Sequence, residues 1–142
     1  MFDFKEKVVL ITGASYGLGE QFAYDFARSG ADLILTARSV EQLEEVGARC
    51  REIGSRVAII PGDVSVEADV KNVISSGIKA LGRIDVLINN AGIADTRGVA
   101  AEQFDSETFN RILSVDLAGA FYYARDCGRH MLERGSGSIV NI

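Results

Sequence analysis

Residues 8–19 read VVLITGASYGLG, an apolar strand that runs into a glycine-rich turn. The glycines have the spacing G-x-x-x-G-x-G, and apolar residues at helical spacing follow them. Gly13 allows the chain to reverse without a Cβ clash, Gly17 allows backbone to approach a phosphate, and Gly19 allows the helix to pack closely on the sheet. Free N–H groups at the start of that helix favour an anion. We therefore predict a nucleotide phosphate site here, with a plain tight turn as the alternative.

The rest of the chain alternates strands and helices with short connections. Ser65 is the expected cap of the helix after the third strand, and Asp105 or Ser106 that of a long fourth helix. Such alternation gives a parallel sheet with helices on both faces, so the fold class is α/β, doubly wound. The expected strands are 8–12, 33–35, 57–60, 86–88 and 138–142, and the expected helices are 18–27, 43–53, 66–78 and 106–133.

Composition limits the class of protein. The 142 residues suit one domain, 1–142, and 47% hydrophobic with 25% charged residues is typical of a soluble globular protein. A formal net charge of −5 argues against a nucleic-acid partner or an anionic membrane surface. No apolar run approaches the length of a membrane span, and the start lacks the apolar core of a signal peptide, so we expect a cytoplasmic protein.

The cysteines and the single histidine give no sign of a reactive or metal centre. Cys50 and Cys127 lack C-x-x-C spacing and fall on helical patterns, which predicts small buried thiols. His130 lies near the end of the long helix, beside Arg129, and we expect it at the surface, where the helix dipole favours it. Without a His/Cys cluster, the sequence predicts no metal site.

Four features directly follow the first four predicted strands, and ligands bind at that end of a doubly wound sheet. They are the glycine turn, Arg38, Asp63 and residues 90–92. We interpret the Asp63 carboxylate as an acceptor for the exocyclic amine of adenine, with a helix cap as the alternative. Asn90-Ala91-Gly92 would bring backbone close to a cofactor sugar, or form a turn that satisfies itself. Together the four predict a dinucleotide site.

Arg38 indicates which dinucleotide is bound. Chains that select NAD usually carry an acid about twenty residues after the glycines, but Ala37 and Arg38 stand there. A guanidinium suits a 2′-phosphate, whereas a carboxylate would repel one. We therefore predict NADP(H) as the preferred cofactor and NAD(H) as the alternative. A solvated arginine beyond a strand is the other reading of this residue.

Asp116 stands out in the predicted long helix because helical spacing places it within an apolar stripe. An ionised carboxylate in such a stripe has to be hydrogen-bonded, paired or placed in a cleft. A buried structural acid and a functional acid fit this pattern equally well. The stripe consists of Phe109, Ile112, Leu113, Leu117, Ala120 and Phe121.

These motifs together resemble the short-chain dehydrogenase/reductase family. Residues 12–19 are similar to its T-G-x-x-x-G-x-G motif, 89–92 to N-N-A-G, and Asp63-Val64 to its adenine-contacting pair. Asp85 stands where the family has an acid before strand four, and 137–142 resembles its fifth strand. The resemblance implies a Rossmann-type sheet of five strands in the order 3-2-1-4-5, ending after strand five, and thus the N-terminal, cofactor-binding part of such a protein.

The resemblance also implies an activity and roles for single residues. The activity is hydride transfer between a nicotinamide cofactor and the carbonyl or alcohol carbon of a small molecule. Ser15 would hold the adenosine ribose or its phosphate, and the backbone of Tyr16 and Leu18 would meet the pyrophosphate. Residues 90–92 would line the ribose beside the nicotinamide. A homo-oligomer is implied through the long helix, 106–133, which commonly packs against its copy in this family.

Two departures from the family pattern bear on catalysis. The family's serine and its Tyr-x-x-x-Lys pair would come after Ile142, so we expect the 142-residue chain alone to be inactive. Asp116 aligns with the family's catalytic asparagine, which supports a water in the proton relay. Aspartate could also accept from water, but its charge would raise a neighbouring tyrosine's pKa. A non-catalytic NADP(H)-binding module, or a truncated inactive fragment, is the alternative interpretation.

Overall fold

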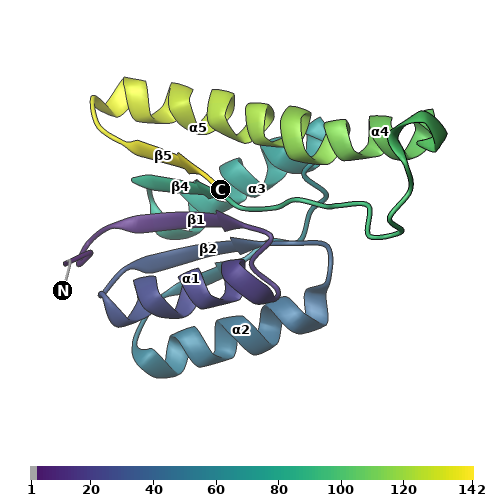
Figure 1. The fold of residues 1–142 in the computed structure, drawn as a ribbon. Coiled ribbons are helices and arrows are strands. Elements are labelled where there is room, and N and C mark those ends of the chain that lie inside the picture. Colours follow the sequence, from purple (N-terminus) through teal and green to yellow (C-terminus); the bar gives the residue numbers. More distant parts are fainter. Residues whose placement is uncertain (1–2) are drawn as a thin grey trace.

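The computed structural model describes residues 3–142, and within them the chain forms one parallel sheet (Figure 1). The strand order is β3-β2-β1-β4-β5, which confirms the predicted α/β class and strand order. The order reverses between β1 and β4, because the chain returns across the sheet after β3. The strands are β1 (Val8–Thr12), β2 (Asp32–Thr36), β3 (Val57–Ile59), β4 (Val86–Asn89) and β5 (Ser138–Asn141).

Helices cover both faces of the sheet and bury two separate apolar clusters. On one face, α1 (Gly17–Arg28) and α2 (Val40–Ile53) pack against alternate residues of the strands. On the other face, α3 (Glu67–Leu81) and α5 (Ala120–Arg134) pack against the intervening residues. Because neighbouring residues of β1 and β2 point to opposite faces and both faces are covered, these strands read as continuous apolar runs.

The two cysteines lie in these two clusters, as predicted. Cys50 on α2 and Cys127 on α5 are both fully buried. Burial raises the pKa of the Cys50 thiol to about 11 and that of Cys127 to about 12. Both side chains are therefore neutral, packed thiols at neutral pH.

The predicted long helix is present but is not a uniform α-helix. It begins as α4 (Ser106–Ile112), continues through a π-helical segment, residues 113–119, and ends as α5. The Asp105 side chain accepts a hydrogen bond from Thr108 N–H at 2.7 Å, which confirms Asp105 as the cap. Single π-helical turns within α-helices often occur at functional sites.

No described helix of residues 3–142 has both the length and the apolar character needed to cross a membrane.

The prediction that Ser65 caps α3 is wrong. The helix begins after Val66, and both the N–H and the hydroxyl of Ser65 donate to Asp63 Oδ1, at 2.9 and 2.6 Å. The Asp69 carboxylate in turn accepts from Asp63 N–H at 2.9 Å. Asp63 therefore closes a tight turn with Ser65, and this turn takes the hydroxyl that would otherwise cap the helix.

His130 is half-buried rather than a surface residue, contrary to the prediction. Its Nε2 atom accepts a hydrogen bond from Ile84 N–H at 3.2 Å, just before β4. Arg134, one helical turn later, donates to the Ile84 carbonyl oxygen at 3.1 Å. The two side chains of α5 therefore bind both backbone polar groups of the buried residue Ile84, and this use of His130 replaces the expected helix-dipole role.

Candidate functional site

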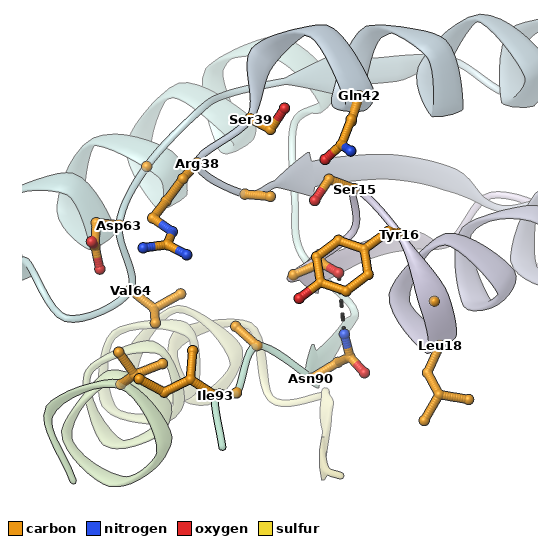
Figure 2. A pocket seen from close by; sticks show the side chains of 17 residues that line it. Ser15, Tyr16, Leu18, Arg38, Ser39, Gln42, Asp63, Val64, Asn90 and Ile93 are labelled. Carbon is orange, nitrogen blue, oxygen red and sulfur yellow. Dashed lines mark hydrogen bonds between the residues drawn. The ribbon is translucent and has the colours of Figure 1, made fainter. Parts of the chain in front are cut away.

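A cavity of about 620 Å³ opens at the carboxyl end of the sheet, where the strands end and the strand order reverses. Every predicted cofactor residue except Gly19 lines it, so residues from the turns after four different strands meet in one place (Figure 2). Open α/β sheets bind their ligands at this position. The predicted residues in its wall are Gly13, Ser15, Tyr16, Gly17, Leu18, Arg38, Asp63, Val64, Asn90, Ala91 and Gly92.

The glycine turn has a different steric reason for each glycine. Gly13 and Gly17 have φ angles of +64° and +62°, which side chains rarely adopt. A Cβ on Gly13 would lie 2.9 Å from Ala91 Cα, whereas a Cβ on Gly17 would meet open space. A Cβ on Gly19 would collide with the Gly13 carbonyl and lie 2.7 Å from Asn90 Nδ2. Gly19 therefore lies behind the wall and keeps the turn closed.

The N-terminus of α1 is open toward the cavity. Tyr16 is its N-cap residue, and no side chain within residues 3–142 caps the first turn. Tyr16 and Leu18 are exposed at 67% and 61%, on either side of Gly17. The unpartnered N–H groups of such a helix start and the helix dipole together favour an anion.

The turn after β4 is fixed to the turn after β1 by Thr12 and Asn90. Thr12 Oγ1 accepts from the N–H groups of Asn90 and Ala91, both at 3.0 Å. The Asn90 amide donates to the carbonyl oxygens of Thr12 at 3.0 Å and Gly13 at 3.3 Å. Asn90 thus bonds the turn after β4 to the turn after β1 through both its side chain and its N–H group, which differs from a turn that only satisfies itself.

Arg38 and Asp63 face one another across one part of the cavity (Figure 2). Burial raises the pKa of Asp63, but the hydrogen bonds from Ser65 and the nearby charges of Arg38 and Arg111 outweigh it and lower the pKa overall. Asp63 is therefore an ionised acceptor. Arg38 is exposed and has neither a hydrogen bond nor an ion pair among the described residues.

Several lining residues were missed by the sequence reasoning. Ser39 is the N-cap residue of α2, and Gln42 lies on the first turn of that helix, beside Ser15 (Figure 2). The Ser39 hydroxyl caps no described N–H group. Their position directly after Arg38 was a usable signal, because it places two polar groups three residues apart at a helix start. Val115 and Ile93 also line the cavity. Ile93 directly follows the predicted residues 90–92, so its position was also a usable signal. Val115 carried none, because only tertiary packing brings the π-helical segment to this wall.

Asp116 lies outside the cavity wall, and its predicted setting is wrong. It is exposed rather than buried in an apolar stripe, because Phe109, Leu117 and Phe121 around it face solvent at 52%, 65% and 57% exposure. Its Oδ1 atom accepts a hydrogen bond from Ile93 N–H at 2.9 Å. The carboxylate therefore needs no buried partner to offset desolvation.

Comparison with known proteins agrees with this geometry. The family model described as short chain dehydrogenase matches residues 7–142. The chain belongs to the short chain dehydrogenase family. This confirms the resemblance inferred from the motifs.

Relatives of this chain are found in plants. 11-beta-hydroxysteroid dehydrogenase-like 4A of Arabidopsis thaliana is 51% identical over 137 residues, which cover 96% of this chain and 45% of that protein. 11-beta-hydroxysteroid dehydrogenase A of Sesamum indicum is 37% identical over 139 residues, which cover 97% of this chain and 39% of that protein. The chain therefore spans less than half the length of these relatives.

Solved structures show the same fold at high similarity. Levodione reductase superposes with a TM-score of 0.93 at 37% identity, covering 97% of this chain and 54% of that chain. A short-chain type dehydrogenase/reductase from Mycobacterium marinum superposes with a TM-score of 0.94 at 32% identity, covering 99% of this chain and 56% of that one.

Proposed function

We propose that residues 1–142 supply the cofactor site of an oxidoreductase that transfers hydride between NADP(H) and a carbonyl or alcohol group of a small molecule. The observation that carries the proposal is the cavity at the strand-order reversal, which joins an uncapped helix start to an unpaired guanidinium. The cavity thus has two anion-binding groups, the start of α1 and the Arg38 guanidinium. NADP(H) carries phosphate at two places, the pyrophosphate and the 2′-phosphate, which these two groups suit. The family membership supports the reaction class.

The lining residues suit the successive parts of the cofactor. The N–H groups of Tyr16 and Leu18 would meet the pyrophosphate, because the space beside Gly17 is open. Ser15 would contact the adenosine ribose or its phosphate. Asp63 would accept from the adenine amine, with Val64 beside the ring. Residues 90–92 would line the ribose next to the nicotinamide, and that ring, when bound, supplies or accepts the hydride.

The preference for NADP(H) over NAD(H) rests on Arg38. A guanidinium without a protein partner can give its donors to a 2′-phosphate, and such charge-assisted hydrogen bonds are strong. The unused hydroxyl of Ser39 stands next to it. Among described residues, no carboxylate forms an ion pair with Arg38. The negative charge of Asp63 is near enough to interact with that of Arg38, but it does not neutralise the guanidinium by direct contact.

Titration of the purified protein with NADPH and with NADH tests this function. We expect saturable binding of both, with NADPH the tighter ligand. Absence of saturable NADPH binding would contradict the proposal. Oxidation of NADPH by a panel of carbonyl compounds, assayed on the protein isolated from its natural source, then separates an enzyme that contains this cofactor site from a non-catalytic NADP(H)-binding module. The module is the second candidate function.

We propose a homo-oligomer formed through α4, the π-helical segment and α5. Leu113, Leu117 and Phe121 continue the spacing of four that begins at Phe109, and all four side chains are at least 39% exposed. A regular stripe of this kind is self-complementary in a two-fold contact. The Arg125 guanidinium lies 5.6 Å from the ring of Phe121, and arginine and aromatic residues are common in interfaces.

Sedimentation analysis of the protein and of Leu117→Glu tests the oligomer. We expect a dimer or larger species that dissociates in the variant, and an unchanged sedimentation coefficient would contradict the interface.

A cytoplasmic location and a small-molecule rather than nucleic-acid partner remain predictions of the sequence, to be checked by cell fractionation and by nucleic-acid titration.

A further inference from the structure

A glycine in the long helix packs against the cavity wall from behind. Gly119 is the last residue of the π-helical segment, residues 113–119, and it is buried. Its φ and ψ angles of −59° and −48° are those of a right-handed helix, so the backbone conformation does not require glycine. Glycine also weakens a helix relative to alanine. A glycine at this position is therefore explained by close packing rather than by its conformational freedom.

The close packing is against Val64. A Cβ on Gly119 would lie 2.9 Å from both the carbonyl oxygen and Cγ2 of Val64, and 3.0 Å from its Cβ. Carbon atoms pack best at about 3.5–4.0 Å, so a side chain at this position would overlap Val64. Val64 lines the cavity next to Asp63 (Figure 2). Gly119 thus gives Val64 the room that it occupies in the wall.

The helical side of this contact is anchored in the core. Val115 and Tyr123 lie four residues before and after Gly119, and they are 6% and 1% exposed. Both belong to the same apolar cluster as Val64. The segment that carries Gly119 is therefore held on both sides, and a larger residue there would displace Val64 rather than the helix.

The turn that carries Val64 is closed by hydrogen bonds on both of its flanks. Asp63 Oδ1 accepts from the N–H group and the hydroxyl of Ser65, at 2.9 and 2.6 Å. The Asp69 carboxylate accepts from Asp63 N–H at 2.9 Å. Val64 lies between these bonded residues, so a displacement of Val64 would carry Asp63 with it.

We propose that Gly119 is a positioning residue for the adenine end of the cavity: its hydrogen in place of a side chain sets how far Val64 and Asp63 stand back from the base. The inference rests on the proposed NADP(H) function, in which Asp63 accepts from the adenine amine and Val64 lies beside the ring. A side chain at position 119 would push this turn into the space of the base. Because NADPH and NADH share that base, both should weaken, whereas a change at Arg38 should weaken NADPH alone.

Calorimetric titration of Gly119→Ala with NADPH, NADH and 2′,5′-ADP tests the role. We expect all three to bind more weakly by a similar factor of about ten, because 2′,5′-ADP carries the adenine without the nicotinamide. Gly77→Ala is the matched control. A Cβ there would lie 2.7 Å from Ile34 Cδ1, and neither of these two residues lines the cavity. This variant should be less stable to urea but should bind all three ligands like the wild type.

Three results would overturn the inference. The first is wild-type affinity for all three ligands in Gly119→Ala. The second is equal weakening of NADPH in Gly119→Ala and Gly77→Ala, because general destabilisation would then account for the loss. The third is weaker NADPH with unchanged 2′,5′-ADP, because the effect would then lie outside the adenine end.

Nuclear Overhauser contacts give a readout in the wild type that does not depend on a folded variant. In the NADPH complex, the Val64 methyl protons should contact both the adenine protons and the α protons of Gly119. Absence of either contact at saturating NADPH overturns the inference. If the wild type binds neither NADPH nor 2′,5′-ADP, the proposed function fails as well, so the two failures are distinguishable.

Discussion

The two ends of the sheet differ in how their polar groups are paired. At the amino end, where the strands begin, Asp85 accepts from Val8 N–H at 2.9 Å and contacts Arg83 at 2.7 Å and Arg134 at 3.2 Å. At the carboxyl end, Arg38 has no such partner within residues 3–142, and the first turn of α1 is uncapped. The comparison teaches that polar groups hold the fold at one end and stay available for a ligand at the other.

The electrostatics of the amino end follow from this pairing. Burial raises the pKa of Asp85, but the hydrogen bonds from Arg83, Val8 N–H and Arg134 outweigh it and lower the pKa overall. Asp85 is therefore ionised and neutralised in place. A ligand would gain little there, because its charge would compete with existing bonds.

The largest expected effect is on stability at the amino end. Asp85→Ala should lower the free energy of unfolding by about 3 kcal/mol, because it leaves a buried N–H group without an acceptor and two arginines without their shared partner. Urea denaturation measures this loss. Asp25→Ala is the control, because the Asp25–Arg28 pair is exposed at the surface. That variant should lose less than about 1 kcal/mol, and similar losses in the two variants would remove the difference between a structural acid and a surface acid.

At the carboxyl end, the main effect should be on binding. Arg38→Ala should weaken NADPH about ten- to a hundredfold, because the 2′-phosphate loses charge-assisted hydrogen bonds. NADH affinity and the free energy of unfolding should stay the same, because Arg38 pairs with no described residue. Calorimetric titration with both cofactors measures the ratio of NADPH affinity to NADH affinity in the variant and in the wild type. A ratio that does not change would mean that Arg38 is a solvated surface residue.

A smaller effect is expected for the histidine at the amino end. His130→Leu should lower the free energy of unfolding by about 1–2 kcal/mol, because Ile84 N–H loses its acceptor in a buried position. His130→Gln offers another acceptor and should lose less. NADPH affinity should not change in either variant. A change in NADPH affinity of more than about threefold would show that the two ends are coupled.

The smallest effect is expected on the pH dependence of the free energy of unfolding at acid pH. The folded-state pKa of Asp85 lies below its unfolded value, so its contribution is present at neutral pH and is lost as the pH falls below about 4, through the folded pKa. Asp85→Asn removes that titration. Its unfolding free energy should therefore fall less steeply than that of the wild type between about pH 4 and pH 2. Parallel pH profiles would assign the acid sensitivity to other carboxylates.

The fold and most of the cavity wall could be predicted because both depend on local signals. Each central strand is a short apolar run between glycine-rich turns or loops, and the wall is built from the residues that follow the strands. Once Gly13, Arg38, Asp63 and Asn90 were assigned to the ends of parallel strands, the parallel arrangement alone brought them together. Thr12 was visible as part of a motif, but its hydroxyl contacts were not.

The rest depends on contacts between distant segments, which spacing does not encode. Helical periodicity identifies an apolar stripe but not which side of it meets the core, so Asp116 was expected among buried residues and is exposed. Ser65 bonds to Asp63 in a local turn that competes with capping. The partner of His130 is Ile84, 46 residues earlier in the chain. Only the packing of α5 on the start of β4 makes that contact.

Chemical-shift mapping of the backbone amides during an NADPH titration tests the difference between the two ends most directly. We expect shifts in residues 13–18, 38–42, 62–64 and 90–93, which surround the cavity, and none at Ile84, Asp85 or His130. Saturable shifts confined to the carboxyl end would support an NADP(H) site at the strand-order reversal. Shifts centred on the amino end, or no shifts with NADPH at saturating concentration, would contradict it.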